Sequence, residues 1–337
     1  MKKEIFKKIK KGIYHMDNEY NWHITTKDFI IIDKNFQHNE ESFKLYEDEV
    51  KNIIDILGGN VFVKLKGIKN LEISDKNSRL AIKDFAKVNL SETKFERDYL
   101  IHLDEERLDL AKKLVTELKP TKIIDISTLV GFVENYVYRT DTYRLGYFTL
   151  ENSIGEKKIS LDETVIDLLI LIQDKNILVE IDYSRSLIRI TTENYIIYTQ
   201  YKELVNPIPL INQVNNEKSK CTTLNFNRIE LINVLKVCDK IAVSDVDNKH
   251  KVIMRGDTNK LTLYSSNSRM NISKDILLNN TVPTNVDVAF NSKFLIECLS
   301  TSMKDLKDIN ILYQNGHSKL FCENKNYTYI FMPMKID

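Results

Sequence analysis

The strongest constraint on the fold is a block of 25 residues that occurs three times without a gap. The blocks are Val61–Phe85, Ile177–Tyr201 and Ile309–Pro333. Each alternates apolar and polar residues, as in VFVKLKG and ILVEIDY, with the period of a half-buried strand. The second turns, DKNS, TTEN and ENKN, fall at the same offset in all three. Each block therefore predicts three strands joined by two turns, and the repetition predicts one structural unit built three times.

A segment with helical spacing precedes each block. These segments are Glu47–Leu57, Leu161–Ile172 and Ser292–Ser302. In the first, Val50, Ile53, Ile54 and Leu57 recur at the three-and-four spacing of one helix face. The theme repeats more weakly with helices expected at Lys2–Lys11, Asp104–Leu118 and Arg228–Lys240, before strand-like segments such as TKIIDIST, KVIMRGD and KLTLYSS.

Six similar halves predict three domains, with limits at 1–95, 96–216 and 217–337. The polar stretch Asn215–Lys220 is the expected second linker. Each domain would pack two helices on antiparallel sheets. Because helices alternate with hairpins and not with single crossover strands, the predicted class is α+β, which disfavours a nucleotide-binding fold.

Composition fits this reading. The chain has 337 residues, 42% hydrophobic and 29% charged, which suits two or three globular domains. The longest apolar run, Leu168–Ile172, is far short of a membrane span, so we expect a soluble, unexported, cytoplasmic protein. The cysteines share no CxxC spacing and are expected as buried reduced thiols: Cys221, Cys238, Cys298 and Cys322.

The sequence contains few candidate catalytic, nucleotide-binding or metal-binding motifs. The six histidines show no HxxxH spacing, and the chain has neither a Walker A loop nor GxGxxG. Asp245 and Asp247 could bind a hard cation, but a solvated turn is the better interpretation. We therefore predict no catalytic residue, no metal site and no cofactor. The net charge of +1 supplies no global attraction for nucleic acid, so a DNA site must come from sorting charge onto particular faces.

Three motifs carry a family resemblance. They are the run NVDVAFNSKFLIECLSTSMKDLKDINILYQ with the terminal YTYIFMPMKI, the segment TDTYRLGYF (Thr140–Phe148), and KELVNPIPLINQV (Lys202–Val214). Together they resemble the bacterial DNA polymerase III beta subunit family, the DNA sliding clamps, over residues 100–337. Residues 46–90 also resemble the second half of that family's first domain. The first 45 match only in outline, which is compatible with a divergent phage or plasmid member.

The resemblance implies a non-enzymatic ring that encircles duplex DNA without reading its sequence and tethers DNA polymerase to it. Three domains make half of a six-domain circle, so it also implies a head-to-tail homodimer at the replication fork, opened by a clamp loader. Helices lining such a hole need cations that meet phosphates. The expected DNA-binding residues are Lys3, Lys7, Lys8, Lys10, Lys11, Arg107, Lys112, Lys113, Arg228, Lys236 and Lys240.

The resemblance further implies a pocket between the second and third domains for short peptides of polymerases and other clamp-motif proteins. Methionine and leucine make an adaptable floor for such peptides. The matching positions are Thr140, Thr142, Tyr143, Arg144, Leu145, Pro209, Val214, Ile330, Met332, Pro333, Met334 and Lys335. Two depart from the family: a Gly-His pair is Thr142-Tyr143 here, and an expected basic residue is Gln213.

Two readings of another class stay open. A monomeric DNA- or protein-binding module built from the clamp fold, such as a phage regulatory factor, would lack a stable dimer. A nuclease would need paired acidic residues and turnover that depends on Mg²⁺. Mass in solution tests the first, and cleavage of labelled DNA tests the second.

Overall fold

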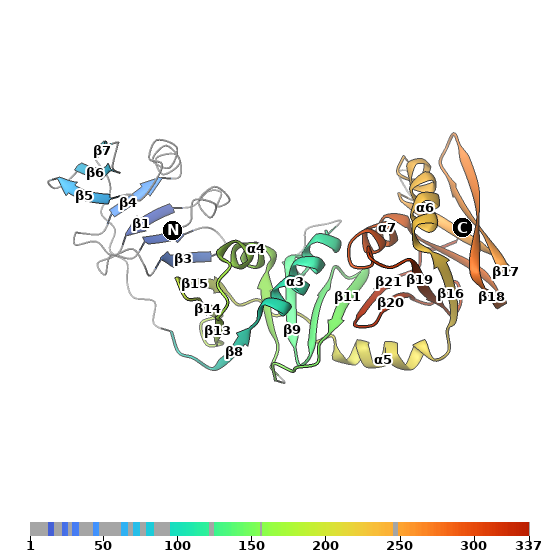
Figure 1. Ribbon diagram of the computed structural model, residues 1–337, viewed down its shortest axis with the longest axis horizontal. Helices are drawn as coiled ribbons and strands as arrows, with labels where there is room; N and C mark the ends of the chain where they lie inside the picture. The colour runs from blue at the N-terminus through green and yellow to red at the C-terminus, as the bar shows by residue number, and fades with distance from the viewer. Residues whose placement is uncertain are drawn as a thin grey trace. The chain divides into compact units, whose positions relative to one another are not determined.

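The computed structural model describes residues 95–120, 125–155, 157–244 and 249–336, together with seven strands within the first 83 residues. The chain forms two compact units (Figure 1). Unit 1 comprises residues 1–109 and 164–202, and unit 2 comprises residues 110–163 and 203–337.

Unit 1 holds an eight-stranded antiparallel sheet in the order β4-β1-β2-β3-β15-β14-β13-β8. Its strands are β1 (Ile13–Met16), β2 (Trp22–Thr25), β3 (Phe29–Asp33), β4 (Phe43–Tyr46), β8 (Tyr99–Leu103), β13 (Ile177–Asp182), β14 (Leu187–Thr191) and β15 (Tyr195–Gln200). A separate three-stranded sheet contains β5 (Phe62–Lys66), β6 (Asn70–Ser74) and β7 (Arg79–Lys83).

Unit 2 holds a second eight-stranded sheet in the order β12-β9-β10-β11-β21-β20-β19-β16. Its strands are β9 (Leu129–Val133), β10 (Tyr136–Thr140), β11 (Arg144–Thr149), β12 (Ile159–Asp162), β16 (Thr222–Asn227), β19 (Asp308–Tyr313), β20 (Leu320–Asn324) and β21 (Tyr327–Phe331). A two-stranded ribbon of β17 (Lys251–Ser266) and β18 (Asn271–Asn291) extends from it.

The two large sheets have the same topology, which makes the repeat visible. In each, a group of four strands joins the three strands of one 25-residue block, through β3 and β15 in unit 1 and through β11 and β21 in unit 2. All three blocks form three strands, as the alternation predicts, and the α+β class is confirmed. The two compact units are each built around one large sheet, and they do not correspond to the three expected domains. The limits 1–95, 96–216 and 217–337 therefore stay a prediction.

Four of the predicted helices are present. They are α3 (Glu105–Glu117), α4 (Glu163–Ile172), α6 (Arg228–Ala242) and α7 (Ser292–Ser300), with a short 3-10 turn η1 (Asp125–Thr128) before β9. Asn227 and Asn291 begin α6 and α7 by accepting backbone N–H bonds on their side chains. The helices expected at Lys2–Lys11 and Glu47–Leu57 lie outside the described residues. None of the described helices has both the length and the apolar character needed to cross a membrane.

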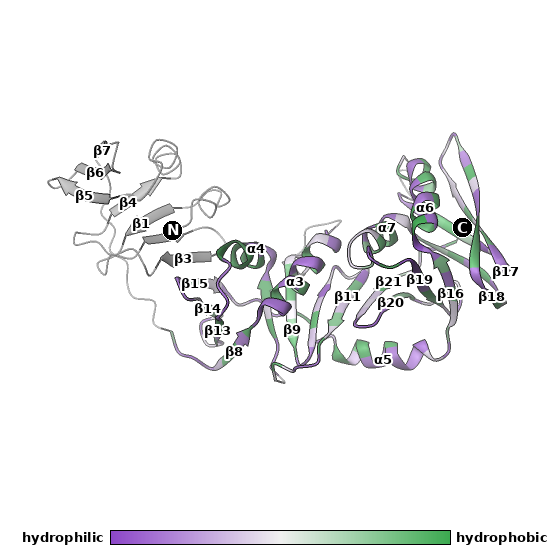
Figure 2. Ribbon diagram, viewed as in Figure 1, coloured by the Kyte–Doolittle hydropathy of each residue, from purple (hydrophilic) through white to green (hydrophobic). Residues whose placement is uncertain are grey.

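Three features differ from the sequence interpretation. The last four residues of the segment TKIIDIST, expected as a strand, form the 3-10 turn η1. The expected linker Asn215–Lys220 begins inside a helix, α5 (Ile208–Lys218). The segments KVIMRGD and KLTLYSS are one continuous strand, β17, because the ladder with β18 passes the polar residues between them through irregular pairing at Gly256–Thr258 and Thr258–Lys260. Hydropathy separates the helices too: Figure 2 shows α4 as almost uniformly apolar, whereas α5 mixes apolar and polar residues.

Opposite faces of the unit 2 sheet carry different cores. On the face we call inner, β11 approaches α3 so closely that a Cβ at Gly146 would lie 2.9 Å from Leu118 Cδ1. On the outer face, Ile211 and Val214 of α5 pack against Leu145 and other apolar residues of the sheet. Figure 1 shows α5 on one side of these strands and α7 on the other. Alternation along β11 therefore sends neighbouring residues to two distinct environments.

The cysteines are free. Cys238, Cys298 and Cys322 are buried, as predicted, while Cys221 is half-buried beside α5.

Candidate functional site

The segment Thr140–Arg144 forms the turn between β10 and β11. The Asp141 carboxylate accepts the backbone N–H groups of Tyr143 and Arg144 at 3.2 and 3.1 Å. The Thr140 hydroxyl donates to the Arg144 carbonyl at 2.8 Å. Thr142 takes a left-handed conformation at φ 75°. The first residues of TDTYRL thus build a defined turn, whose tip presents Tyr143 with 54% of its surface exposed.

Arg144 points to the inner face and is only 2% exposed. Its guanidinium donates to Asp141 at 2.8 Å, to Glu297 of α7 at 2.6 Å, and to the Lys119 carbonyl. It also lies 4.1 Å from the centre of the Phe294 ring. Burial alone would lower the pKa of Arg144, but its neighbours, the Asp141 carboxylate among them, raise it overall, so the side chain stays charged. Arg144 therefore makes structural contacts in the interior of unit 2 and does not present its charge on the surface.

The outer face gathers the apolar members of the predicted peptide site. Leu145 and Ile330 are paired in the β11–β21 ladder, and Val214 shares their buried cluster. Beside them Met332 is 44% exposed, and its backbone N–H donates to the Tyr143 carbonyl at 3.0 Å. Exposed aromatic and methionine side chains over a buried aliphatic base are suited to contact an apolar peptide.

The remaining predicted members of the peptide site lie at its margins. Pro209 is exposed in the first turn of α5, whereas Pro207, which precedes that helix, is buried. Thr140, Pro333 and Met334 are half-buried, and Thr142 and Lys335 are exposed. The structure therefore brings Leu145, Val214 and Ile330 together, with Tyr143 and Met332 linked beside them, and places Arg144 on the opposite face.

A glycine and a tyrosine hold the chain in place before α5. Gly131 of β9 faces Tyr138 of β10, and a Cβ at Gly131 would lie 2.3 Å from that ring. The ring therefore lies across the glycine, and its hydroxyl donates to the Val205 carbonyl at 2.9 Å. Because Gly131 has no side chain, the Tyr138 ring has room to lie over it. The hydrogen bond from that ring then holds Val205, in the segment that leads into α5.

A buried carboxylate that sequence reasoning missed joins α3 to residues near the other end of the chain. Glu117 is fully buried and accepts hydrogen bonds from the hydroxyls of Ser302 and Tyr327. Burial raises the pKa of Glu117, and the hydrogen bonds from its neighbours oppose that rise without cancelling it. Its partners Ser302 and Tyr327 are 185 and 210 residues away in sequence, so no local spacing could reveal the contact.

The predicted DNA-binding residues fall into three groups. Lys113 of α3 and Lys236 and Lys240 of α6 are exposed, and Lys112 is half-buried. Arg107 is buried against Asp104, and Arg228 donates to the carbonyls of Leu299 and Leu306 at 3.0 and 2.7 Å, so both arginines serve structural contacts. The rest lie outside the described residues: Lys3, Lys7, Lys8, Lys10 and Lys11.

The part of the chain that the structure describes brings together no group of three His, Cys, Asp or Glu side chains able to hold an ion. Asp245 and Asp247 lie outside that part.

Comparison with known proteins gives a consistent result for the fold. No protein-family model matches the chain, and no curated protein matches it by sequence. Solved structures do match. The DNA polymerase III beta subunit of Thermotoga maritima aligns with a TM-score of 0.76 at 16% identity, covering 99% of this chain and 97% of that one.

Two further structures agree. The DNA polymerase sliding clamp of Pseudomonas aeruginosa gives a TM-score of 0.74 at 11% identity, over 97% of this chain and 92% of that one. The Helicobacter pylori beta clamp bound to a DNA ligase peptide gives 0.72 at 15% identity, over 96% and 91%. The chain therefore has the fold of the beta sliding clamps along almost its whole length.

Proposed function

We propose that this chain is a DNA sliding clamp, a non-enzymatic ring of two copies that encircles duplex DNA and tethers replication proteins to it. The observation that carries the proposal is the way the half-sheets pair. A half-sheet here is either a four-strand group or the three strands of one 25-residue block, and some half-sheets are joined to another within this chain while others are not. Two large sheets arise by joining a four-strand group to a block. The same chain contains one more block, β5–β7, and one more set of strands in the place of a four-strand group, β17–β18, each of which forms a sheet of its own.

The same strand pairing could occur between two copies of the chain. It would then join β17–β18 of one copy to β5–β7 of the other. In unit 2 the joining strand β11 is the third strand after helix α3; the corresponding segment after α6 is the first half of β18, Asn271–Leu278. Among the described strands β18 pairs only with β17, so this edge is open. Two joints of this kind, related by a twofold axis, close a ring of six repeats and cover edges that otherwise invite aggregation.

Two exposed apolar side chains also support the open edge of β18 as the contact between copies. Leu277 is 57% exposed and Met270, in the turn before β18, is 55% exposed. Two such side chains at and beside an open strand edge are suited to contact a second sheet.

The exposed lysines of α3 and α6 suit a duplex held without base readout. Lys113, Lys236 and Lys240 can meet phosphates through water, and each phosphate contact contributes about 0.9 to the salt slope of DNA binding. Removing Lys236 and Lys240 together should therefore lower that slope by roughly 2. An unchanged slope would place α6 away from the DNA.

Light scattering over a concentration series, followed by retention on circular and linearised DNA, tests the ring. We expect a dimer that stays on circular DNA and is lost from cut ends. Leu277→Glu should weaken the dimer, whereas Ile229→Glu, an equally exposed change on α6, should leave it intact. A persistent monomer with ordinary salt-dependent binding would instead support the monomeric binding module.

We infer that the partner site is the surface around Tyr143 and Met332, over the buried Leu145–Ile330 pair. The DNA ligase peptide of the Helicobacter pylori complex is a suitable probe. Because Leu145 is buried, the test uses the two exposed side chains: Tyr143→Glu with Met332→Glu should abolish binding while leaving thermal stability unchanged. Full binding by this double variant would exclude the surface.

A further inference from the structure

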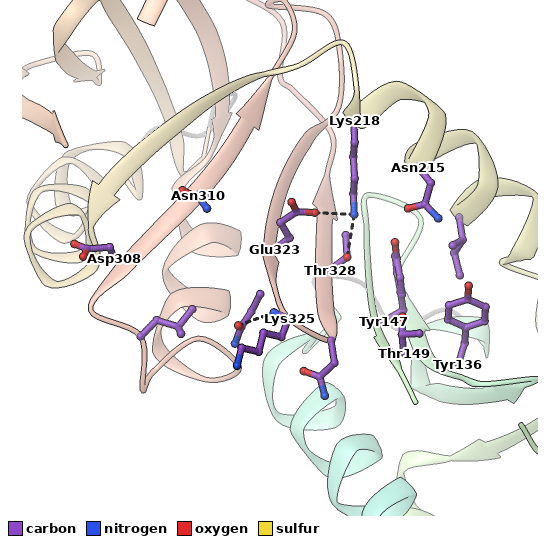
Figure 3. Close-up of a pocket in the computed structure, with 14 residues that line it drawn as sticks. Tyr136, Tyr147, Thr149, Asn215, Lys218, Asp308, Asn310, Glu323, Lys325 and Thr328 are labelled. Carbon is purple, nitrogen blue, oxygen red and sulfur yellow. Dashed lines mark hydrogen bonds and ion pairs between the residues drawn. The ribbon is translucent and has the colours of Figure 1, made fainter. Parts of the chain in front are cut away.

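A polar hollow lies on the outer face of the unit 2 sheet, beside α5. It has a volume of about 620 Å³, within the range of ligand sites. Twelve of its fourteen lining residues carry a polar group, whereas small-molecule sites are lined mainly by apolar side chains. Figure 3 shows Lys218 and Asn215 entering it from α5, Tyr147 and Thr149 from β11, and Glu323 from β20.

Its position relates it to the proposed peptide surface. Along β11, Leu145, Tyr147 and Thr149 share the outer face, and on β21 Ile330 and Thr328 lie opposite the first two. The apolar surface occupies the Leu145–Ile330 end and the hollow occupies the other. Residues two apart on a strand are about 7 Å apart. The two regions are therefore neighbours on one sheet face, with α5 packed over the strands between them.

Charge in the hollow is largely balanced. Lys218 Nζ lies 2.8 Å from the Glu323 carboxylate and 3.2 Å from the Thr328 hydroxyl, as the dashed lines in Figure 3 show. Lys325 and Asp308 add one charge of each sign. A strongly anionic or cationic ligand would therefore gain little here.

Uncharged donors and acceptors dominate instead. Four carboxamides line the hollow: Asn215, Asn310, Asn324 and Asn326. Each carboxamide can donate and accept, which matches the alternating N–H and C=O groups of an extended polypeptide. The Tyr136 and Tyr147 rings, with centroids 5.8 Å apart, give one wall an aromatic surface for a side chain.

We propose that the hollow binds a polar polypeptide segment that flanks the apolar motif of a clamp partner, an inference that rests on the proposed function. An apolar surface beside a polar, hydrated margin is the usual anatomy of a protein interface. A helix with its side chains is about 10 Å wide and an extended chain advances about 3.3 Å per residue, so three or four residues would cross α5. The apolar motif supplies affinity and the hollow selects among partners.

Peptide display on the full-length protein tests this. The library keeps the ligase peptide as a constant core and randomises eight residues on each side. We expect the wild type to select polar flanks, and the selected peptides to bind five- to tenfold more weakly to the Asn215→Ala/Asn326→Ala double variant, the loss of one or two hydrogen bonds. Asn216→Ala, an exposed neighbour on α5 that does not line the hollow, is the matched control and should select the same flanks as the wild type.

Two failures are distinguishable. If the core peptide itself fails to bind the wild type, the proposed partner site is wrong and the hollow loses its context. In the second case the core peptide binds equally to the wild type, the double variant and the Asn216→Ala control. If the wild type then selects no polar flanks, or the double variant selects the same flanks as the wild type, only the hollow proposal is overturned.

Discussion

Replacing Arg144 with methionine should destabilise unit 2 without removing a peptide contact. The resemblance to clamps places Arg144 in the peptide site, but its guanidinium is buried among Asp141, Glu297 and the Lys119 carbonyl. Methionine keeps much of the length and the contact with Phe294 while removing the charge. Asp141, 4% exposed, would then be a buried carboxylate without its cation.

The magnitude follows from these contacts. Breaking a buried ion pair by removing one partner costs about 3–5 kcal/mol, because the remaining charge stays desolvated. Glu297 is partly exposed and keeps Lys293 at 3.8 Å, so most of the cost should arise at Asp141. For a unit of this size, 1 kcal/mol corresponds to roughly 2–4 °C in melting temperature, which gives a fall of about 6–20 °C.

Thermal denaturation followed by circular dichroism measures the fall, and amide exchange at β11 and β21 localises it. Arg144→Met with Asp141→Asn should recover about 1–3 kcal/mol, because the uncompensated charge is gone. Lys335→Met, an exposed basic position, is the control and should not change stability. A loss below about 1 kcal/mol in Arg144→Met, combined with weakened ligase-peptide binding, would refute the structural role.

Two further predictions concern buried contacts of unit 2. Glu117→Gln should remove a pH dependence: burial raises the pKa of Glu117, so its contribution is full below the ordinary glutamate pKa and is lost as pH rises through the raised value. Urea midpoints from pH 5 to 9 should show the wild type losing stability relative to the variant, by about 1.4 kcal/mol per unit of pKa difference, and a flat difference would contradict this. Gly131→Ala should cost about 1–3 kcal/mol by displacing Tyr138 and freeing Val205, measured by thermal denaturation. Tyr138→Phe, which loses only the hydroxyl bond, should cost about 1 kcal/mol, and equal effects of the two changes would argue against the clash.

Local pattern explains which elements the sequence predicts. The three blocks form strands because alternation at a period of two persists through each, and their turns contain Asn, Asp and Gly or Ser residues that favour reversal. The helix α5 escaped prediction because NPIPLINQVNNEK has two prolines and few strong helix formers. Its stability comes from packing Ile211 and Val214 onto the sheet, which is tertiary and leaves no local signal.

The candidate site was predicted in part for the same reason. The apolar positions Leu145 and Ile330 come together because strand register pairs them, and Met332 follows directly after β21, where its backbone N–H donates to the Tyr143 carbonyl. The orientation of Arg144 depends on Glu297, 153 residues away. A motif records that an arginine is present, but only the fold decides which face of β11 it occupies.

The β11–β21 ladder connects these observations. Its inner face carries Arg144, and its outer face carries both the apolar surface and the hollow, so a perturbation on one face alters the strands that form the other. A ligand on the outer face should therefore stabilise unit 2, by about 2.7 kcal/mol at a hundredfold excess over its Kd. A variant of the inner face would lower apparent affinity only by reducing the folded population. Peptide at that excess should then raise the melting temperature of such a variant by as much as that of the wild type, whereas it should not raise the melting temperature of a variant that has lost the contact itself.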